Sequence, residues 1–238
     1  MRSFFIAAAV FVVCGCAGSS RLEPYYPVYR NIRLDVRPAT YRTPYFDLRH
    51  PIYIMADKSL WSGCAKDRAG YKACRASRIK DIYAGLNQWF EYFDKANRPR
   101  AVIVFSGKEL PANLKNKVVR LRIEADNCGE YKPGKNYAGC YRREVPEIVF
   151  DHPSYIIPRL VAHEFGHTFG RGDNDVPEET HSVMSYGHPI DVSPLDMAMM
   201  CRLHYECQMV KRKDGKSYDP VLLPVGDDSA SPGGADGS

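Results

Sequence analysis

The most regular pattern of hydrophobic and polar positions lies between Arg75 and Asn97. Apolar residues recur there at spacings of three and four, which is the period of one helix face. The chain then reaches Pro99, which cannot continue a helix. We therefore predict an amphipathic helix over residues 75–97, with a buried face made of Ile79, Ile82, Tyr83, Leu86, Trp89, Phe90 and Phe93.

Short apolar runs elsewhere predict β-strands. One run is continuously apolar, AVIVFSG, as expected of a buried strand. Another, KVVRLRIEA, alternates apolar and polar residues, as expected of a strand with one exposed face. The strands predicted in this way cover residues 51–57, 101–107, 117–125 and 147–153.

Two further helices are predicted toward the C-terminus. The first covers about residues 155–169 and directly follows the last predicted strand. The second covers residues 193–207, where Ser193 can cap the first turn and Pro194 suits its first position. Asp196 favours the same helix start because its charge opposes the positive end of the helix dipole.

The composition limits what kind of protein this is. The chain has 238 residues, of which 45% are hydrophobic and 26% charged. This composition is typical of a globular domain, which we place at residues 51–225. The net charge of +5 comes without a long Lys/Arg run or a basic helix, so we expect no nucleic-acid partner. Residues 226–238 have the composition of a disordered tail.

The N-terminal residues have the layout of an export signal. An apolar run of ten residues, 4–13, follows an arginine and is too short to span a bilayer. Its end, Val-Cys-Gly-Cys, resembles a bacterial lipobox, and that resemblance implies a signal peptide of residues 1–16 with a lipid anchor on Cys16. Residues 17–50 would then form a tether and an extended segment. The alternative is ordinary signal cleavage near Ala17.

Cysteine usage also favours an oxidising compartment. Beyond Cys16, six cysteines form three pairs that are close in sequence, within predicted loops or near helix ends. Six cysteines allow fifteen connectivities, and the sequence alone does not decide between them. The close spacing suggests local disulfides, and the absence of a C-x-x-C motif argues against a structural zinc cluster. The suggested pairs are Cys64–Cys74, Cys128–Cys140 and Cys201–Cys207.

The segment HEFGHTFGRGD, residues 163–173, carries the candidate chemistry. His163 and His167 are four apart, so on a helix both imidazoles lie on one face and can reach one metal ion. Glu164 is rotated away from that face by one residue, which suits a general base that deprotonates water. This is the H-E-x-x-H arrangement of zinc hydrolases. The alternative is a helix with two structural histidines and no metal.

The residues after this helix extend the pattern. Gly170 stands where the chain must leave the helix with a positive φ, which glycine adopts easily. The chain can then turn back and bring Asp173 to the same metal ion. The full pattern H-E-x-x-H-x-x-G-x-x-D, followed by Ser-Val-Met-Ser-Tyr, resembles the metzincin clan of zinc endopeptidases. In that clan the methionine, here Met184, lies beneath the metal-binding histidines. In its astacin-like and serralysin-like members a tyrosine in the position of Tyr186 can bind zinc or stabilise the oxyanion.

The third ligand is the main departure from that clan. Most metzincins have histidine where this chain has Asp173, and snapalysin-like bacterial enzymes have aspartate. Carboxylate oxygen is an acceptable zinc ligand. The other residues that could supply the third ligand are Asp175, Glu178, His181 and His188.

The resemblance covers roughly residues 50–207 and implies an α+β fold. It would comprise a mixed twisted sheet, a long backing helix, an active-site helix and a C-terminal helix. It also implies one catalytic Zn²⁺, protein or peptide substrates, and substrate pairing with the exposed edge of the strand at 147–153. We expect a monomer in the bacterial cell envelope, as an outer-membrane lipoprotein or otherwise secreted. Two alternatives remain open: a catalytically inactive binding lipoprotein on this fold, and a zinc amidase acting on cell-wall peptides.

Overall fold

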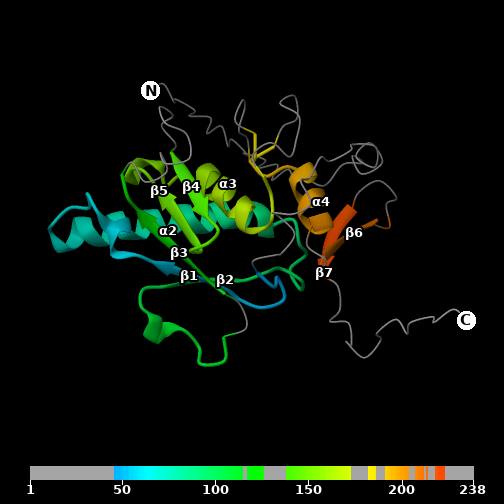
Figure 1. The fold of residues 1–238 in the computed structure, drawn as a ribbon, viewed down its shortest axis with the longest axis horizontal. Helices are drawn as coiled ribbons and strands as arrows, with labels where there is room; N and C mark the ends of the chain where they lie inside the picture. The colour runs from blue at the N-terminus through cyan, green and yellow to red at the C-terminus, as the bar shows by residue number, and fades with distance from the viewer. Residues whose placement is uncertain are drawn as a thin grey trace, which may run out of the picture.

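The computed structural model describes residues 46–114, 117–125, 138–172, 182–185, 191–203, 207–211, 213 and 218–222. These residues form a mixed α/β fold. A five-stranded sheet lies in front of the helices α2 (Arg68–Phe90) and α3 (Pro158–Thr168) (Figure 1). The strand order is β2-β1-β3-β5-β4. The strands are β1 (Ile52–Ala56), β2 (Ala101–Val104), β3 (Val118–Ile123), β4 (Gly139–Arg142) and β5 (Glu147–Phe150).

Four of these strands run parallel and the fifth, β4, is antiparallel to its neighbour β5. In register, Tyr53 of β1 lies beside Val102 of β2 and Val118 of β3. Leu121 of β3 lies beside Ile148 of β5. The sequence therefore predicted four of the five strands of the sheet, and the mixed α/β class is confirmed.

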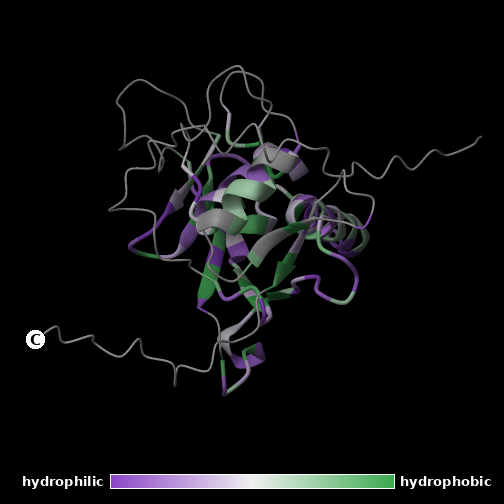
Figure 2. Ribbon diagram, turned by 90° about the vertical axis from the view of Figure 1, so that its right-hand side faces the viewer, coloured by the Kyte–Doolittle hydropathy of each residue, from purple (hydrophilic) through white to green (hydrophobic). Residues whose placement is uncertain are grey.

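One face of the sheet is buried, and the other is partly exposed. Alternate residues of β1 point into the core, where Ile52 and Ile54 have no exposed surface. On the outer face Val102 is 37% exposed. Hydrophobic residues gather in the strands and in α3, and hydrophilic residues lie toward the outside (Figure 2). The helices therefore cover only one face of the sheet.

The long helix α2 spans Arg68–Phe90, which is seven residues earlier than predicted at both ends. Asp67 caps its start by accepting a hydrogen bond from the Gly70 backbone N–H at 2.8 Å. The first turns are exposed, so they carry no apolar periodicity that could be read from the sequence. Phe93 is buried but lies beyond the helix end, where its backbone N–H donates to the Phe90 carbonyl.

The edge strand β4 corrects two sequence predictions. No strand was predicted between residues 125 and 147, yet Gly139–Arg142 forms one. The strand at 147–153 was predicted to expose its edge, but β5 pairs with β3 on one side and β4 on the other. That prediction is wrong, because four residues with one glycine and one arginine give β4 too weak a pattern to be recognised. Among the strands that the structure describes, β2 and β4 form the two edges of the sheet.

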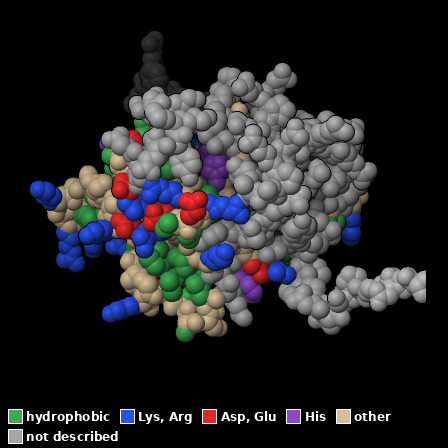
Figure 3. Space-filling model, in the orientation of Figure 1, with side chains coloured by type: hydrophobic (Ala, Val, Ile, Leu, Met, Phe, Trp, Pro, Cys, Tyr) green, Lys and Arg blue, Asp and Glu red, His purple; other side chains and the backbone are tan. Residues whose placement is uncertain are grey.

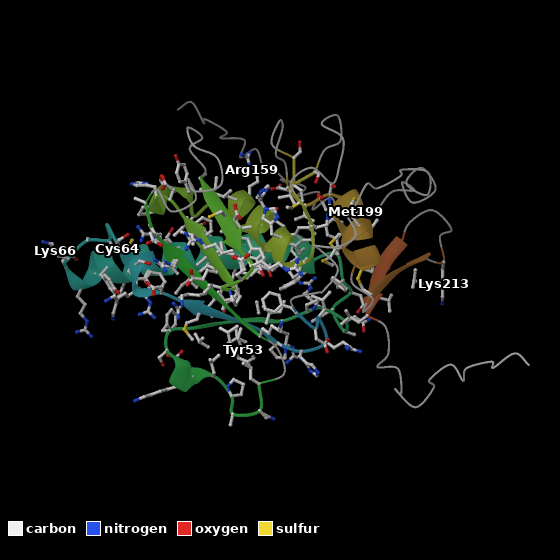
Figure 4. All side chains as sticks on the ribbon, viewed as in Figure 1. Tyr53, Cys64, Lys66, Arg159, Met199 and Lys213 are labelled. Atoms are coloured by element: carbon white, nitrogen blue, oxygen red, sulfur yellow. A yellow bond between two sulfur atoms is a disulfide. The ribbon has the colours of Figure 1, made fainter. Side chains whose placement is uncertain are left out.

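The C-terminal helix is also shorter than predicted. Helix α4 spans Pro194–Leu203, and Cys207 already begins strand β6 (Cys207–Lys211), which pairs with β7 (Tyr218–Leu222) as an antiparallel hairpin. This hairpin was not predicted. Cys64 and Lys66 lie at one end of the longest axis, whereas Met199 of α4 and Lys213 beside β6 lie toward the other (Figure 4).

Two of the predicted disulfides are confirmed, Cys64–Cys74 and Cys201–Cys207. Cys140 is disulfide-bonded as well. Its predicted partner Cys128 lies outside the described residues, as does Cys16. Among the helices that the structure describes, none combines the length and the apolar character needed to cross a bilayer.

The core reaches back into the segment predicted as a tether. Phe46 and Leu48 are each 1% exposed and belong to the hydrophobic core. The Phe46 ring lies against Phe169 at the end of helix α3, with ring centroids 6.4 Å apart. The packed part of the chain therefore includes residues 46–50, before β1. Residues 1–45 and 226–238 lie outside the described residues.

Candidate metal centre

Helix α3 (Pro158–Thr168) carries His163, Glu164 and His167. Pro158 occupies its first turn, which suits proline because that position needs no backbone N–H donor. The helix lies tightly against α2, where a Cβ added at Gly85 would come within 2.5 Å of the Pro158 carbonyl oxygen. The Trp89 side chain of α2 also donates to the Ala162 carbonyl at 2.9 Å. These contacts fix the axial position of the helix that carries the candidate ligands.

Both histidines have one ring nitrogen committed to a backbone carbonyl. The His163 Nδ1 atom lies 2.8 Å from the Val183 carbonyl oxygen, and the His167 Nδ1 atom lies 2.9 Å from the Arg171 carbonyl oxygen. A carbonyl only accepts, so both Nδ1 atoms must carry the proton. In the neutral imidazole, Nε2 is then the nitrogen without a proton, and that nitrogen can bind a metal ion. The two ring centroids are 5.0 Å apart, and the rings are nearly perpendicular.

Glu164 lies beside these histidines and is 2% exposed. Its Oε2 atom is 4.0 Å from the Nε2 atom of His167. Its Oε1 atom faces the edge strand β4, where a Cβ added at Gly139 would be 3.0 Å away. The absence of a side chain at Gly139 thus leaves room for the carboxylate between α3 and the sheet edge.

The end of α3 reverses the chain, as the sequence predicted. Gly170 has a φ of 81°, in the left-handed region that favours glycine. The Gly170 N–H donates to the His167 carbonyl, and the Arg171 N–H donates to the Gly166 carbonyl. This pair of hydrogen bonds is a Schellman motif. It turns the chain back, so that the Arg171 carbonyl meets the His167 imidazole.

The Met184 side chain packs against helix α3. Residues 182–185 form a turn in which the Ser185 N–H donates to the Ser182 carbonyl at 3.1 Å. The Met184 side chain is fully buried, and its Sδ atom would be only 2.3 Å from a Cβ added at Gly166. Gly166 stands between the two histidines along the helix. The methionine therefore packs against the helix backbone between the two candidate ligands.

The remaining predicted site residues lie outside the part of the chain that the structure describes. Asp173 and Tyr186 lie outside the described residues, as do the alternative third ligands Asp175, Glu178, His181 and His188. Within the described part of the chain, no group of three or more His, Cys, Asp or Glu side chains could hold a metal ion. The described residues therefore supply two candidate ligands and one candidate base.

Several residues around this site were missed from the sequence. Asp196 was expected only to favour the start of α4. Its carboxylate also accepts the Val183 N–H at 3.0 Å, and so it reaches the turn at residues 182–185 that contains Met184, which we call the methionine turn. Arg171 was not recognised, although it is fully buried and donates to Asp196. Its position directly after Gly170 of the motif was the only available signal. Gly139 gave none, because its contact with Glu164 joins distant parts of the chain.

The outer face of the sheet carries charged side chains near the edge strand. Glu147 of β5 is nearly buried and lies 3.3 Å from Arg120, 3.6 Å from Arg122 and 3.9 Å from Arg142. Acidic and basic side chains gather on this face (Figure 3).

Within β4, burial raises the pKa of Tyr141 to about 12, against the opposing effect of Arg143. Tyr141 therefore stays protonated at neutral pH.

Comparisons with known proteins add no assignment. No protein-family model matches the chain, and no curated protein matches its sequence significantly.

Proposed function

We propose that the chain is an exported zinc-dependent endopeptidase of the metzincin type, with His163 and His167 as zinc ligands and Glu164 as the general base. The mixed sheet, the long helix α2 behind it and the order of α3, methionine turn and α4 support this proposal. Helix α3 carries the motif, and α2, β4 and the methionine turn contact that helix.

One observation carries the proposal: both candidate ligands are oriented as metal ligands are. Metal-binding histidines almost always donate their second ring N–H to a carbonyl or a carboxylate, which fixes the tautomer and the ring direction. Here His163 and His167 both do so through Nδ1, to carbonyls on two different segments.

Asp173 is proposed as the third ligand. The course of the chain just before Asp173 supports this assignment. The Arg171 carbonyl accepts from His167, so the chain two residues before Asp173 lies beside the second ligand. Two residues of extended chain span at most about 7 Å, which is compatible with a carboxylate at position 173 reaching the same ion, and a carboxylate is an acceptable partner for two imidazoles. Tyr186, two residues after Met184, is proposed to stabilise the oxyanion.

The chain's own residues define the proposed mechanism. A bound Zn²⁺ supplies a Lewis acid that acidifies water and polarises a carbonyl group. Glu164 takes a proton from the attacking water and later delivers it to the leaving amine. The surroundings of Glu164 suit this role, because it is almost fully buried between α3 and Gly139 and so is shielded from bulk solvent.

The edge strand β4 is the proposed docking strand for an extended peptide. It is the outermost strand on the side of the sheet that faces Glu164, since Gly139 contacts that carboxylate. An extended substrate can add to an exposed edge through main-chain hydrogen bonds. This replaces the strand at 147–153 as the predicted substrate edge. The disulfides at Cys64–Cys74 and Cys201–Cys207 support action outside the cytoplasm.

The test is cleavage of unfolded casein by the oxidised, purified chain and by Glu164→Gln. We expect the wild type to cleave, a chelator to abolish cleavage, and added zinc to restore it. Glu164→Gln keeps the size of the side chain but cannot accept the proton. It should therefore retain zinc and lose about a hundredfold or more in rate, since positioned general bases contribute this much.

The outcomes separate the proposal from the two alternatives. Zinc binding without cleavage of casein by the wild type, together with cleavage of cell-wall peptides, would indicate an amidase. Zinc binding without cleavage of either substrate would indicate a binding protein. Equal cleavage by the wild type and Glu164→Gln would contradict the assigned base.

A further inference from the structure

Two opposite charges are completely buried beside the candidate metal centre. The side chains of Arg171 and Asp196 are both 0% exposed, and Arg171 Nη1 lies 3.2 Å from Asp196 Oδ1. Burying such a pair costs desolvation free energy that the attraction between the charges often fails to offset. The pair is therefore weak as a simple source of stability. Its position in the hydrogen-bond network indicates what else it does.

Arg171 connects to one histidine through its own backbone. Its carbonyl accepts the His167 Nδ1–H, and its N–H closes the turn at the end of α3. Its guanidinium donates to both the backbone carbonyl and the carboxylate of Asp196, at 3.0 Å and 3.2 Å. The side chain thus fastens the residue whose carbonyl orients His167.

Asp196 connects to the other histidine through the methionine turn. Its Oδ1 atom accepts from the Ser182 hydroxyl, and its Oδ2 atom accepts the Val183 N–H. Val183 is the residue whose carbonyl accepts the His163 Nδ1–H. The same Oδ2 atom also accepts the Ser193 N–H and hydroxyl, at 2.9 Å and 2.8 Å, which fastens Asp196 to the start of α4.

We propose that the Arg171–Asp196 ion pair is a positioning device that orients His163 and His167 together for one metal ion. The inference rests on the proposed zinc function. Each histidine is held by a carbonyl, each carbonyl belongs to a segment fastened by one member of the pair, and the pair joins the two segments. A shift of either charge would therefore turn an imidazole.

The pair also explains why these carbonyls hold their places. Residue 171 follows a left-handed glycine, and residues 182–185 form a tight turn, so neither segment is held by a regular sheet or helix. A planar guanidinium presents several donors in a fixed geometry, which lysine cannot reproduce. In this protein one atom, Arg171 Nη1, donates to both acceptors of Asp196.

The test compares zinc affinity in Arg171→Met, Arg171→Lys and the wild type, by competition with a chromophoric chelator. Replacing groups that orient metal ligands typically lowers affinity by about 10- to 100-fold. We expect a loss in this range for Arg171→Met and a smaller loss for Arg171→Lys, which keeps the charge. The visible spectrum of the Co²⁺-loaded chain should change in Arg171→Met, because it reports ligand geometry.

Leu60→Ala is the matched control. Leu60 is fully buried, but it lies in the short 3₁₀ helix η1 (Lys58–Trp61), away from the histidines along the chain. It should lower the unfolding midpoint of the metal-free chain while leaving the Co²⁺ spectrum unchanged. A spectrum altered in Arg171→Met but not in Leu60→Ala identifies orientation rather than general stability.

The outcomes are distinguishable. If the wild type binds zinc and Arg171→Met binds it equally well with an unchanged spectrum, the positioning role is wrong and the zinc site stands. The same readout in Arg171→Lys decides the point if Arg171→Met does not fold. If the wild type binds no zinc, the proposed function fails and this inference fails with it. Zinc binding without proteolysis would contradict the peptidase and leave the positioning result valid.

Discussion

At the scale of single residues, the site depends on positions where a side chain is missing. Gly166 lies between the candidate ligands on α3, and the Met184 sulfur fills the space that a Cβ would take. Gly139 leaves room for the Glu164 carboxylate in the same way. The motif specifies the residues that carry chemistry. The glycines determine how closely the methionine turn and the sheet edge approach them.

Gly166→Ala should destabilise the metal-free chain. Alanine gains about 1 kcal/mol of helix propensity, but overpacking a core typically costs about 1–3 kcal/mol. The contact at 2.3 Å is with the Met184 sulfur, so that side chain must move. We expect a net loss of up to about 2 kcal/mol in the free energy of unfolding, measured with urea.

The control for this prediction is the double variant Gly166→Ala with Met184→Ala. Removing the methionine side chain opens the space that the new Cβ needs. The double variant should therefore be less destabilised than the sum of the two single variants. Additive effects would show that the two residues do not compete for the same space.

Tyr141 should make the stability depend on pH in the alkaline range. Its pKa in the folded chain is raised to about 12 by burial. A raised pKa in the folded state means that the stabilisation is fully present below the ordinary tyrosine pKa. It is then lost as the pH rises from about 10 through about 12.

The comparison is with Tyr141→Phe, which keeps the ring and removes the ionising hydroxyl. The free energy of unfolding of the wild type should fall more steeply with pH over this window than that of the variant. The other tyrosines are common to both proteins and cancel in the difference. Equal slopes would contradict the assignment to Tyr141.

At the scale of elements, the candidate site is built where three segments meet: α3, the edge strand β4 and the methionine turn. The contact between α3 and β4 carries the candidate base, and the contact between α3 and the turn carries the ligands. These two contacts can be disturbed separately. Metal binding and base chemistry should therefore separate in suitable variants.

Gly139→Ala tests the contact between β4 and α3. Gly139 lies in a strand and needs no positive φ, so alanine suits its backbone. The new Cβ would be 3.0 Å from Glu164 Oε1 and 3.3 Å from the Val149 carbonyl oxygen, which displaces the carboxylate by a few tenths of an ångström. Small misplacements of reacting groups are costly, so we expect about a tenfold fall in casein cleavage with zinc affinity unchanged.

Gly107→Ala is its matched control. Gly107 has no atom within 4 Å of an added Cβ and also lacks a positive φ. It should leave both cleavage and zinc affinity unchanged. A loss of zinc affinity in Gly139→Ala would contradict the view that β4 approaches the base rather than the ligands.

At the scale of the whole molecule, the sequence predicted what depends on local patterns. The helix with the motif, the left-handed Gly170 and four of the sheet strands follow from short-range periodicity and turn chemistry. The edge strand β4 and the hairpin of β6 and β7 did not, because short strands are defined by pairing partners that the sequence pattern does not reveal. The Arg171–Asp196 pair joins residues 25 apart, and only the folded chain brings them together.

The central claim is that His163 and His167 hold a catalytic zinc ion, and metal analysis after dialysis against limiting zinc tests it most directly. The proposed account predicts one zinc per wild-type chain, one in Glu164→Gln, and none retained by the double variant His163→Ala with His167→Ala. The measurement must use folded protein with its disulfides intact, verified by circular dichroism. A wild-type chain that retains no more zinc than the double variant would contradict the account, and the motif would then be a helix and turn with structural histidines.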